Sequence, residues 1–319
     1  PPTGLINAQM LIVRSTSDSL NPLFLYYLIL TPFYFERLRG LATGSAQPQL
    51  SIASLRELEI SIPQSEEQNK IASILSAYDD LFANNSRRIK ILQEMAKTIY
   101  DEWFVKFHFP GHEKVKMVES ELGLIPEGWE VKRLGEVCSI LMGQSPKSEY
   151  YNTKGEGLPF HQGVTDFGER FPSTRVFCNI AGRVAEPGDI LFSVRAPVGR
   201  INLADCRIVI GRGLSAIRNL EGFQCFTLYQ LRDVFSKEDI IGGGTIFKAV
   251  TKGDMEGIKC LYPPKDYLIG YEKVCVPISE ELAVLDKKNR ILRRTRDLLL
   301  PKLISGEIDV ENLDIKTEE

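Results

Sequence analysis

The stretch SEEQNKIASILSAYDDLFANNSRRIKILQEMAKTIYDEWFV (residues 65–105) decides the fold of this chain. Its apolar residues recur with a seven-residue period, which is typical of a helix that packs along its length against a partner helix. One row of this predicted seam holds Ile71, Tyr78, Asn85, Leu92 and Ile99. The pattern predicts one long helix over 65–105, which measures about 60 Å at 1.5 Å per residue. Ser65 and Gln68 predict a capping box at its start.

A second stretch near the C-terminus carries the same row in the same frame. Its members are Tyr271, Ile278, Leu285, Leu292 and Leu299. Pro277 predicts either a kink or the start of the helix, and Gly306 is typical of a helix stop. Neither helix can bury its row alone, so we expect the two to pack on each other, with Asn85 fixing the register. The alternative is that each helix lies on its neighbouring globular domain.

A faint internal repeat surrounds the two helices. GSAQPQLSIASLRELEISIP (44–63) and GTIFKAVTKGDMEGIKCLYP (244–263) share the first glycine and the last proline. Apolar residues keep matching places at Leu50/Val250, Leu55/Met255, Leu58/Ile258 and Ile62/Tyr262. Residues 122–200 precede only the second copy, which indicates an ancestor with two full repeats whose first copy has lost such a segment. The chain starts with PPTG and no Met, so we expect its true N-terminus to be missing.

Composition argues against several classes of protein. With 319 residues, of which 43% are hydrophobic, we expect two or three folding units. The net charge of −3 gives no global sign of a polyanion partner, so any nucleic-acid site must be a local patch. Six scattered cysteines and three histidines predict buried reduced thiols rather than a zinc site. No signal peptide is visible, and the longest apolar run, 22–30, is too short to cross a membrane. It favours a buried helix with Asn21 as N-cap and Pro22 at the first helical position.

Motifs for catalysis are not found in the sequence. Serine, cysteine and histidine show no nucleophile-and-base spacing. GGGTIFK (242–248) lacks the phosphate-binding pattern and is predicted to be a turn. The acidic pairs lie in the predicted helices, where solvated faces explain them better than acid–base chemistry.

The second copy carries a local excess of positive charge. Between residues 183 and 218 stand Arg183, Arg195, Arg200, Arg207, Arg212 and Arg218, against Glu186, Asp189 and Asp205. Arginine and glutamine in loops suit bidentate contacts to guanine and adenine edges, whereas lysine and tyrosine suit phosphate contacts. Ordinary surface arginines and turn-capping residues remain the alternative for any single position. The candidate DNA contacts are Gln144, Ser145, Lys147, Tyr150, Tyr151, Gln162, Arg195, Arg200, Arg212 and Lys248, with Arg14, Gln47 and Gln49 in the first copy.

Short strands and one further helix complete the second copy. Strands are predicted within EPGDILFSVRAPVG (186–199), CRIVIG (206–211) and GIKCLYP (257–263). GFQCFTLYQLRDVF (222–235) is predicted to be helical. This part of the chain therefore favours a mixed α/β fold in which strands dominate.

Over most of its length the chain resembles the specificity subunit of type I restriction–modification enzymes. The resemblance rests on GLIPEGWEVKRLGEV (123–137), GQSPKSEYYNTKGEGLPFHQG (143–163), AEPGDILFSVRAPVG (185–199), IGRGLSAIR (210–218), ISIPQSEEQNKIASILSAYDD (60–80) and RDLLLPKLISGEI (296–308). It implies an α+β fold in which mixed α/β target-recognition domains are joined by two long antiparallel helices forming a coiled coil, with an internal two-fold repeat.

The resemblance also implies boundaries for these parts. They are the C-terminal part of the first recognition domain (1–63), the first spacer helix (64–108), a linker (109–121), the second recognition domain (122–264), the second spacer helix (265–306) and a tail (307–319). The incomplete first domain departs from the family's pattern.

The implied function is non-catalytic. Each recognition domain reads one half of a split, asymmetric site in double-stranded DNA, and the chain recruits two methyltransferase subunits and the restriction subunits. S-adenosylmethionine, ATP and magnesium are then expected on those partners and no cofactor on this chain, with a cytoplasmic location and no membrane. Two alternatives remain open: a coiled-coil assembly protein that does not read DNA, and an enzyme.

Overall fold

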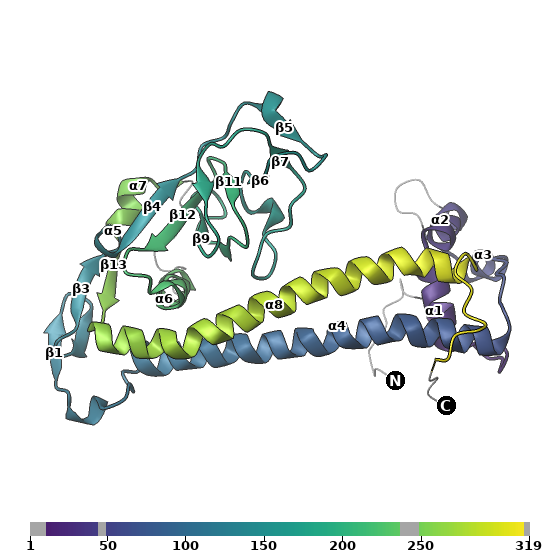
Figure 1. The fold of residues 1–319 in the computed structure, drawn as a ribbon, viewed down its shortest axis with the longest axis horizontal. Helices are drawn as coiled ribbons and strands as arrows, with labels where there is room; N and C mark the ends of the chain where they lie inside the picture. The colour runs from purple at the N-terminus through teal and green to yellow at the C-terminus, as the bar shows by residue number, and fades with distance from the viewer. Residues whose placement is uncertain (1–10, 44–48, 237–248, 316–319) are drawn as a thin grey trace. The chain divides into compact units, whose positions relative to one another are not determined.

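The computed structural model describes residues 11–43, 49–236 and 249–315, which fall into two compact units (Figure 1). The first unit takes the described residues up to Lys90 and those from Val284 onward, and the second takes Ile91–Ala283. The two longest helices, α4 (Ser65–Tyr100) and α8 (Lys265–Ile304), contribute a part to each unit. Each unit is described by itself.

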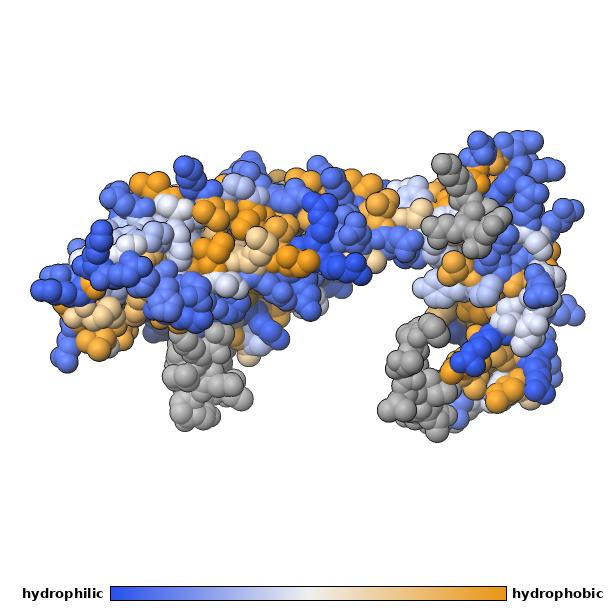
Figure 2. Space-filling view, turned by 90° about the horizontal axis from the view of Figure 1, so that it is seen from below, coloured by the Kyte–Doolittle hydropathy of each residue, from blue (hydrophilic) through white to orange (hydrophobic). Residues whose placement is uncertain are grey.

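The first unit is helical in its described residues. α1 (Pro22–Leu30), α2 (Pro32–Leu41) and α3 (Ile52–Arg56) accompany the ends of α4 and α8 that belong to this unit. Its core is built from Phe24, Leu25, Tyr27, Leu28, Tyr34, Ile71, Ala72, Leu75, Leu300, Leu303 and Val310. The prediction for the start of α1 is confirmed, because the Asn21 side chain accepts hydrogen bonds from the first turn and Pro22 is the first helical residue. Apolar side chains also remain exposed on this unit, as Figure 2 shows.

The predicted capping box at the start of α4 is wrong. The fully buried Gln68 accepts a hydrogen bond at Oε1 from Asn21 N (2.9 Å), not from Ser65. Its Nε2 donates to the backbone oxygens of Ser19 (2.9 Å) and Pro63 (2.8 Å). The Gln68 side-chain amide thus satisfies three backbone groups from two chain segments. These hydrogen bonds stabilise the folded chain more than the predicted capping box would. Gln68 therefore joins α1 to α4.

The second unit is a mixed α/β structure. Its strands are β1 (Met117–Ser120), β2 (Gly123–Pro126), β3 (Glu130–Arg133), β4 (Cys138–Met142), β5 (Tyr151–Asn152), β6 (Leu158–His161), β7 (Phe177–Cys178), β8 (Val184–Ala185), β9 (Ile190–Ser193), β10 (Ile201–Leu203), β11 (Ile208–Ile210), β12 (Leu214–Asn219) and β13 (Lys259–Tyr262). β10-β9-β12-β4 form one antiparallel sheet and β5-β7-β6-β11-β8 form another, in which β6 and β11 are parallel. The strands predicted within 186–199, 206–211 and 257–263 are confirmed as β9, β11 and β13. The segment predicted as a linker holds β1, which pairs with β2.

A single large core holds the first of these sheets against the helices. The predicted helix of 222–235 is confirmed as α6 (Gln224–Ser236), which lies between the β9–β12 sheet and the start of α8 in Figure 1. Two short helices, α5 (Leu134–Val137) and α7 (Lys252–Glu256), flank β3 and β4. Phe226, Tyr100 and Tyr271 meet there from α6, α4 and α8, with ring centroids 6.1–6.5 Å apart. Glu272 of α8 accepts a hydrogen bond from Phe226 N (2.8 Å), so α8 also caps α6.

The two long helices contact each other within each unit. In the first unit, Asn289 Nδ2 donates to Ser86 Oγ (3.3 Å) and Arg296 pairs with Asp79. In the second, the ring of Tyr271 lies beside Trp103, with centroids 6.2 Å apart. Residue numbers rise along α4 as they fall along α8, so the two segments are antiparallel in both units.

The ends of the long helices differ in part from prediction. α8 runs from Lys265 through Pro277 without a break, so a helix start at Pro277 is wrong. The predicted stop at Gly306 is confirmed by its positive φ of 75° and by its N–H, which donates to Leu303 O. α4 ends at Tyr100 and continues as a π-helical turn over Asp101–Val105, rather than remaining α-helical to 105.

Elements recur at matching positions in the two units. α3 begins at Ile52 after the N-cap Ser51, and α7 begins at Lys252 after the N-cap Thr251. α4 then begins at Ser65 and α8 at Lys265. Within the described residues, these helices therefore begin at positions that the register between 44–63 and 244–263 aligns.

Candidate nucleic-acid interface

The carboxyl ends of two parallel strands meet at one edge of the second unit. Because β6 and β11 run in the same direction, the loops that follow them lie side by side. Gly211 N donates to His161 O (2.8 Å) and Gly213 N donates to Gln162 O (3.1 Å). Gln162 and Arg212, which are distant in sequence, are thereby placed on adjacent loops, and both are exposed.

A third loop, which follows β4, crosses the other two at very close range. A Cβ on Gly143 would lie 2.2 Å from the backbone oxygen of Gly211, so only glycine fits there. Two residues later, Ser145 Oγ donates to Gln162 Oε1 (2.8 Å) and accepts from Arg212 N (3.2 Å). Ser145 therefore connects all three loops through one hydroxyl group.

The hairpin between β9 and β10 reaches the same edge. Val194 N donates to Gly213 O (3.0 Å), and Val250 N donates to Val194 O (2.9 Å). Arg195 forms an isolated bridge with Ala249 and its side chain is exposed. Gln144 is exposed as well, and its backbone N donates to Ile210 O (3.0 Å). We call this group of predicted contacts, drawn from four loops, the edge cluster: Gln144, Ser145, Gln162, Arg195 and Arg212.

The arginines between residues 183 and 218 form two groups, those paired with a carboxylate and those that are not. Arg207 Nε lies 3.2 Å from Glu186 Oε1, and Arg218 Nε lies 2.6 Å from Asp189 Oδ1. The other four are exposed and lie more than 4.0 Å from any carboxylate of the described residues: Arg183, Arg195, Arg200 and Arg212. The two paired arginines are explained by structure alone. The unpaired ones keep their donors available for a ligand.

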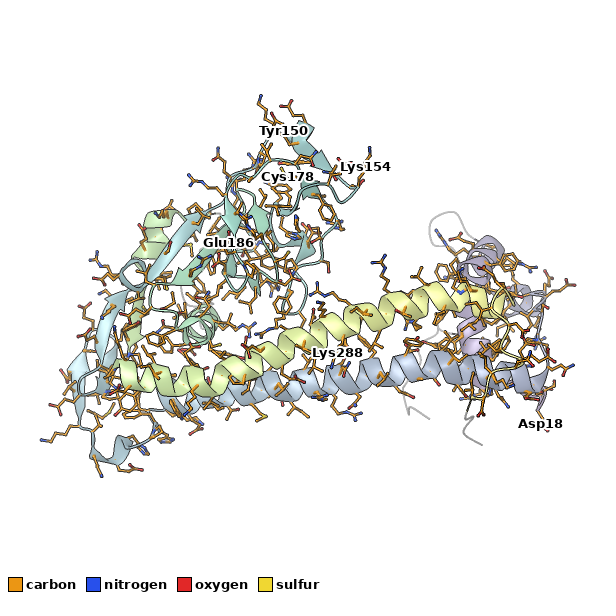
Figure 3. All side chains as sticks on the ribbon, viewed as in Figure 1. Asp18, Tyr150, Lys154, Cys178, Glu186 and Lys288 are labelled. Carbon is orange, nitrogen blue, oxygen red and sulfur yellow. The ribbon has the colours of Figure 1, made fainter. Side chains whose placement is uncertain are left out.

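The remaining predicted contacts of the second unit lie near the tip of β5. Figure 3 places Tyr150 at that tip, and Tyr150 is half-buried. Tyr151 has a structural role, because its hydroxyl donates to Pro146 O (2.7 Å) and its ring stacks on Phe160 with centroids 4.5 Å apart. Lys147 is exposed, with Nζ 3.9 Å from Glu149 Oε1.

The predicted contacts of the first copy belong to the first unit or lie outside the described residues. Arg14 and Gln49 are exposed residues of the first unit, where the backbone of Gln49 pairs with Thr43 through two hydrogen bonds. Gln47 and Lys248 lie outside the described residues.

The predicted seam residues avoid solvent. Ile71, Asn85, Tyr271 and Leu285 are buried. Tyr78, Leu92, Ile99, Ile278, Leu292 and Leu299 are half-buried. The residues that immediately precede Leu92 and Leu292 differ, since Ile91 is 49% and Ile291 is 55% exposed. The inward faces therefore coincide with the predicted rows.

Sequence reasoning missed His161, which immediately precedes Gln162. Its side chain is fully buried, and burial lowers its pKa, opposed by the nearby Asp166. His161 Nδ1 lies 3.6 Å from Asp166 Oδ2, and Nε2 lies 3.5 Å from Thr174 Oγ1. Asp166 pairs in turn with Arg175. The imidazole thus supports the loop that carries Gln162. The sequence signal was a lone histidine that ends an apolar strand beside a glutamine.

Comparisons with known proteins bear directly on the family and the fold of this chain. A family model described as the type I restriction modification DNA specificity domain matches residues 4–94 and 126–293. The chain belongs to this family. It is therefore a specificity subunit of a restriction–modification system, concerned with DNA target recognition and not with catalysis.

Several relatives are similar over nearly the whole chain. A Methanocaldococcus jannaschii protein assigned as the MjaX specificity subunit of a type I restriction enzyme is 36% identical, over 95% of this chain and 72% of its own. The MjaIX specificity subunit of the same organism is 30% identical, over 91% of this chain and 70% of its own. The crystal structure of the type I S subunit from M. genitalium has a TM-score of 0.63 at 21% identity and covers 89% of this chain and 73% of that one, which shows a shared fold.

The described residues hold neither a candidate membrane span nor a candidate metal site. No helix there is both long and apolar enough to cross a membrane. No group of three histidine, cysteine or acidic side chains there is arranged to hold a metal ion.

Proposed function

We propose that the second unit reads one half of a bipartite, asymmetric DNA site through the edge cluster. The observation that carries this proposal is the convergence of exposed glutamine and arginine side chains from four loops, held by backbone hydrogen bonds. Arg212 and Arg195 offer paired donors that match guanine, and Gln144 and Gln162 offer the donor and acceptor that match adenine. The neighbouring unpaired arginines supply phosphate contacts.

The first unit, on this proposal, is the closing part of a second reader. Its support is the recurrence of α3 with α7 and of the starts of α4 with α8, which is expected of a duplicated recognition domain followed by a spacer helix. α4 and α8 act as an antiparallel coiled coil that spaces the readers. A rod of about 60 Å is close to the rise of about 18 base pairs of DNA.

The partners follow from this role. Two methyltransferase subunits and the restriction subunits assemble on the chain in the cytoplasm. S-adenosylmethionine, ATP and magnesium are bound by those partners and not by this chain.

The test is footprinting of the chain in complex with its methyltransferase subunits, combined with mapping of methylated adenines in a host that carries the system. We expect protection of one split sequence, and loss of preference at single bases in edge-cluster variants. Steep salt dependence is also expected, because phosphate contacts release counterions. Binding without any sequence preference, or no salt-dependent binding, instead favours a coiled-coil assembly protein.

A further inference from the structure

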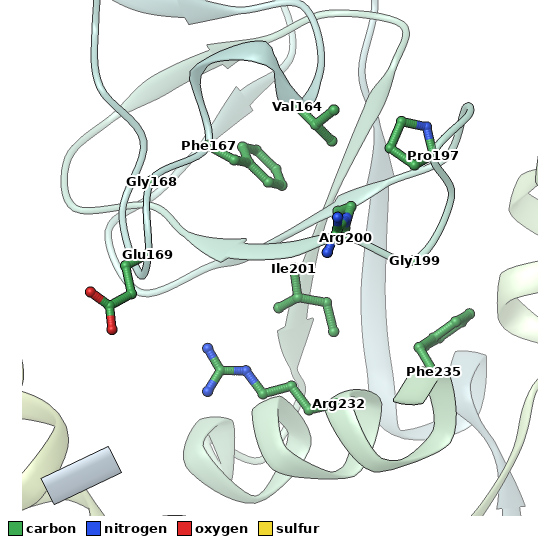
Figure 4. Close-up of a pocket in the computed structure, with 10 residues that line it drawn as sticks. All are labelled: Val164, Phe167, Gly168, Glu169, Pro197, Gly199, Arg200, Ile201, Arg232 and Phe235. Atoms are coloured by element: carbon green, nitrogen blue, oxygen red, sulfur yellow. The ribbon is translucent and has the colours of Figure 1, made fainter. Parts of the chain in front are cut away.

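A hollow of about 560 Å³ lies in the second unit (Figure 4). Three segments line it: Val164–Glu169, the hairpin segment Pro197–Ile201, and Arg232 with Phe235 of α6. The first segment begins two residues after Gln162, and the hairpin carries Arg195 on its other arm. Two of the three walls of the hollow are therefore close in sequence to residues of the edge cluster.

Two arginines face this hollow from different segments. Figure 4 shows Arg200 and Arg232 among the apolar side chains of Phe167, Ile201 and Phe235. Arg200 is exposed and Arg232 is half-buried. Arg232 lies over the ring of Tyr229, with its guanidinium carbon 5.5 Å from the centroid, and no described carboxylate is within 4.0 Å of it. Burial lowers the pKa of Arg232, and the neighbouring Tyr229 opposes this effect.

A third arginine lies next to Arg232 and is almost completely buried. Arg170 is 3% exposed, and its Nη2 donates to Ser279 Oγ (2.6 Å). Its Nε and Nη1 have no hydrogen-bond partner. Burial lowers the pKa of Arg170; Tyr229 opposes this shift and the positive charge of Arg232 adds to it, so Arg170 lies near both of them. No carboxylate of the described residues is paired with either one.

Such an arrangement is unfavourable without an anion. Two guanidinium groups withdrawn from water repel each other, and no carboxylate of the described residues pairs with either one. Glu169 is the carboxylate on the rim of the hollow, but it is exposed, and Figure 4 shows its side chain turned outward. A tetrahedral phosphate accepts several N–H bonds at once from arginine, and phosphates are among the anions that guanidinium groups bind best.

We propose that this hollow is a phosphate-binding site. Arg200 and Arg232 contact the phosphate oxygens, and Arg170 stabilises the site from behind. The source that the geometry favours is a backbone phosphate of the DNA strand whose bases lie at the edge cluster, an assignment that rests on the proposed function. Free inorganic phosphate has the same chemistry and is the other source.

The experiment measures DNA affinity at a series of salt concentrations for the full chain with its methyltransferase subunits. Replacing Arg232 by Gln is expected to lower the slope of log K against log salt by about one and to weaken binding to target and non-target DNA alike. The matched control is Arg207→Gln, whose guanidinium is already occupied by Glu186. The control should keep the native slope.

A second arm follows thermal unfolding of the same proteins with inorganic phosphate against chloride at equal ionic strength. The native chain should be stabilised by phosphate and the Arg232→Gln variant should not, because a ligand stabilises only the state that binds it. A changed salt slope identifies the DNA backbone as the source, and a phosphate response alone identifies free phosphate. Native behaviour of Arg232→Gln in both arms overturns the site.

Misfolding of the variants is distinguished from loss of the phosphate site. Removing one of two repelling cations should not lower the melting temperature of the free chain, and Arg200→Gln changes only an exposed side chain of the same hollow. Arg200→Gln should show the same loss of slope. Sequence preference is read separately by footprinting, so failure of the phosphate site and failure of DNA reading give different results.

Discussion

The crossing of the loops at Gly143 predicts that a single methyl group disables the edge cluster. In Gly143→Ala the new Cβ would be 2.2 Å from Gly211 O and 2.8 Å from Ile210 O, both of them backbone atoms that cannot rotate away. The two loops must therefore separate. Forced overpacking of this kind costs about 1–3 kcal/mol. Separation also weakens the hydrogen bonds from Gly143 N to Leu214 O (2.9 Å) and from Gln144 N to Ile210 O (3.0 Å).

Each of those bonds contributes about 1 kcal/mol, so we expect a loss of about 2–4 kcal/mol in the free energy of unfolding. DNA reading should suffer in addition, because Ser145 no longer connects the displaced loop to Gln162 and Arg212. Loss of one base contact corresponds to about 1–3 kcal/mol, or about 5- to 150-fold in preference for the target.

The assays are urea unfolding and competition between target and non-target DNA. The matched control is Gly163→Ala, beside Gln162, where an added Cβ meets no atom within 4 Å and the backbone is extended with φ −172°. We expect native stability and preference for this control. Equal behaviour of Gly143→Ala and Gly163→Ala would refute the reasoning, since it would show that the crossing does not hold the cluster.

Three further predictions follow from the same structure. Gln162→Ala and Arg212→Ala should relax preference at individual bases by about 1–3 kcal/mol each in a binding-site selection, whereas a uniform loss on all sequences would identify phosphate contacts. Leu92→Glu should lower the free energy of unfolding by about 1–3 kcal/mol, because it places a charge on the half-buried face of α4. The neighbouring Ile91→Glu, at a 49% exposed position, should change it little, and equal effects of the two would contradict the seam. Burial lowers the pKa of His161 below its ordinary 6.5, so the unfolded chain takes up the proton first as pH falls. Stability should therefore fall below about pH 6.5, and His161→Gln should lose this part of the dependence in melts from pH 7 to 5.

Helical periodicity allowed the long helices to be predicted well. The rows at Ile71 and Tyr271 lie inward because a seven-residue period leaves one face apolar whatever the neighbouring structure is. The start of α4 was less predictable. A capping box is a local pattern, and the tertiary bonds of Gln68 to Ser19 and Asn21 replaced it. Pro277 does not begin the helix for a similar reason. Packing of α8 along its length offsets the one backbone hydrogen bond that a proline cannot donate.

The site was predictable in its residue types and not in its pairing. The arginine excess of 183–218 pointed to a basic patch, but only the structure separates Arg207 and Arg218, each paired with a carboxylate, from Arg195 and Arg212. Pairing depends on contacts between segments that are distant in sequence. The sequence also did not indicate that Arg170 is buried beside the proposed phosphate site, because nitrogen atoms without hydrogen-bond partners have no sequence signature.

The edge cluster also suggests how one scaffold can serve different DNA sequences. Its loops are positioned by main-chain groups, such as Gly213 N donating to Gln162 O and Gln144 N donating to Ile210 O, and by the glycine crossing. The outward side chains of Gln144 and Arg212 are exposed and contribute little to these contacts. Exchange of either side chain should therefore alter the preferred base while leaving the unfolding free energy within about 0.5 kcal/mol. Ser145 and Gln162 are the exceptions, because the bond from the Ser145 hydroxyl to Gln162 Oε1 joins two loops, so Ser145→Ala should cost both stability and preference.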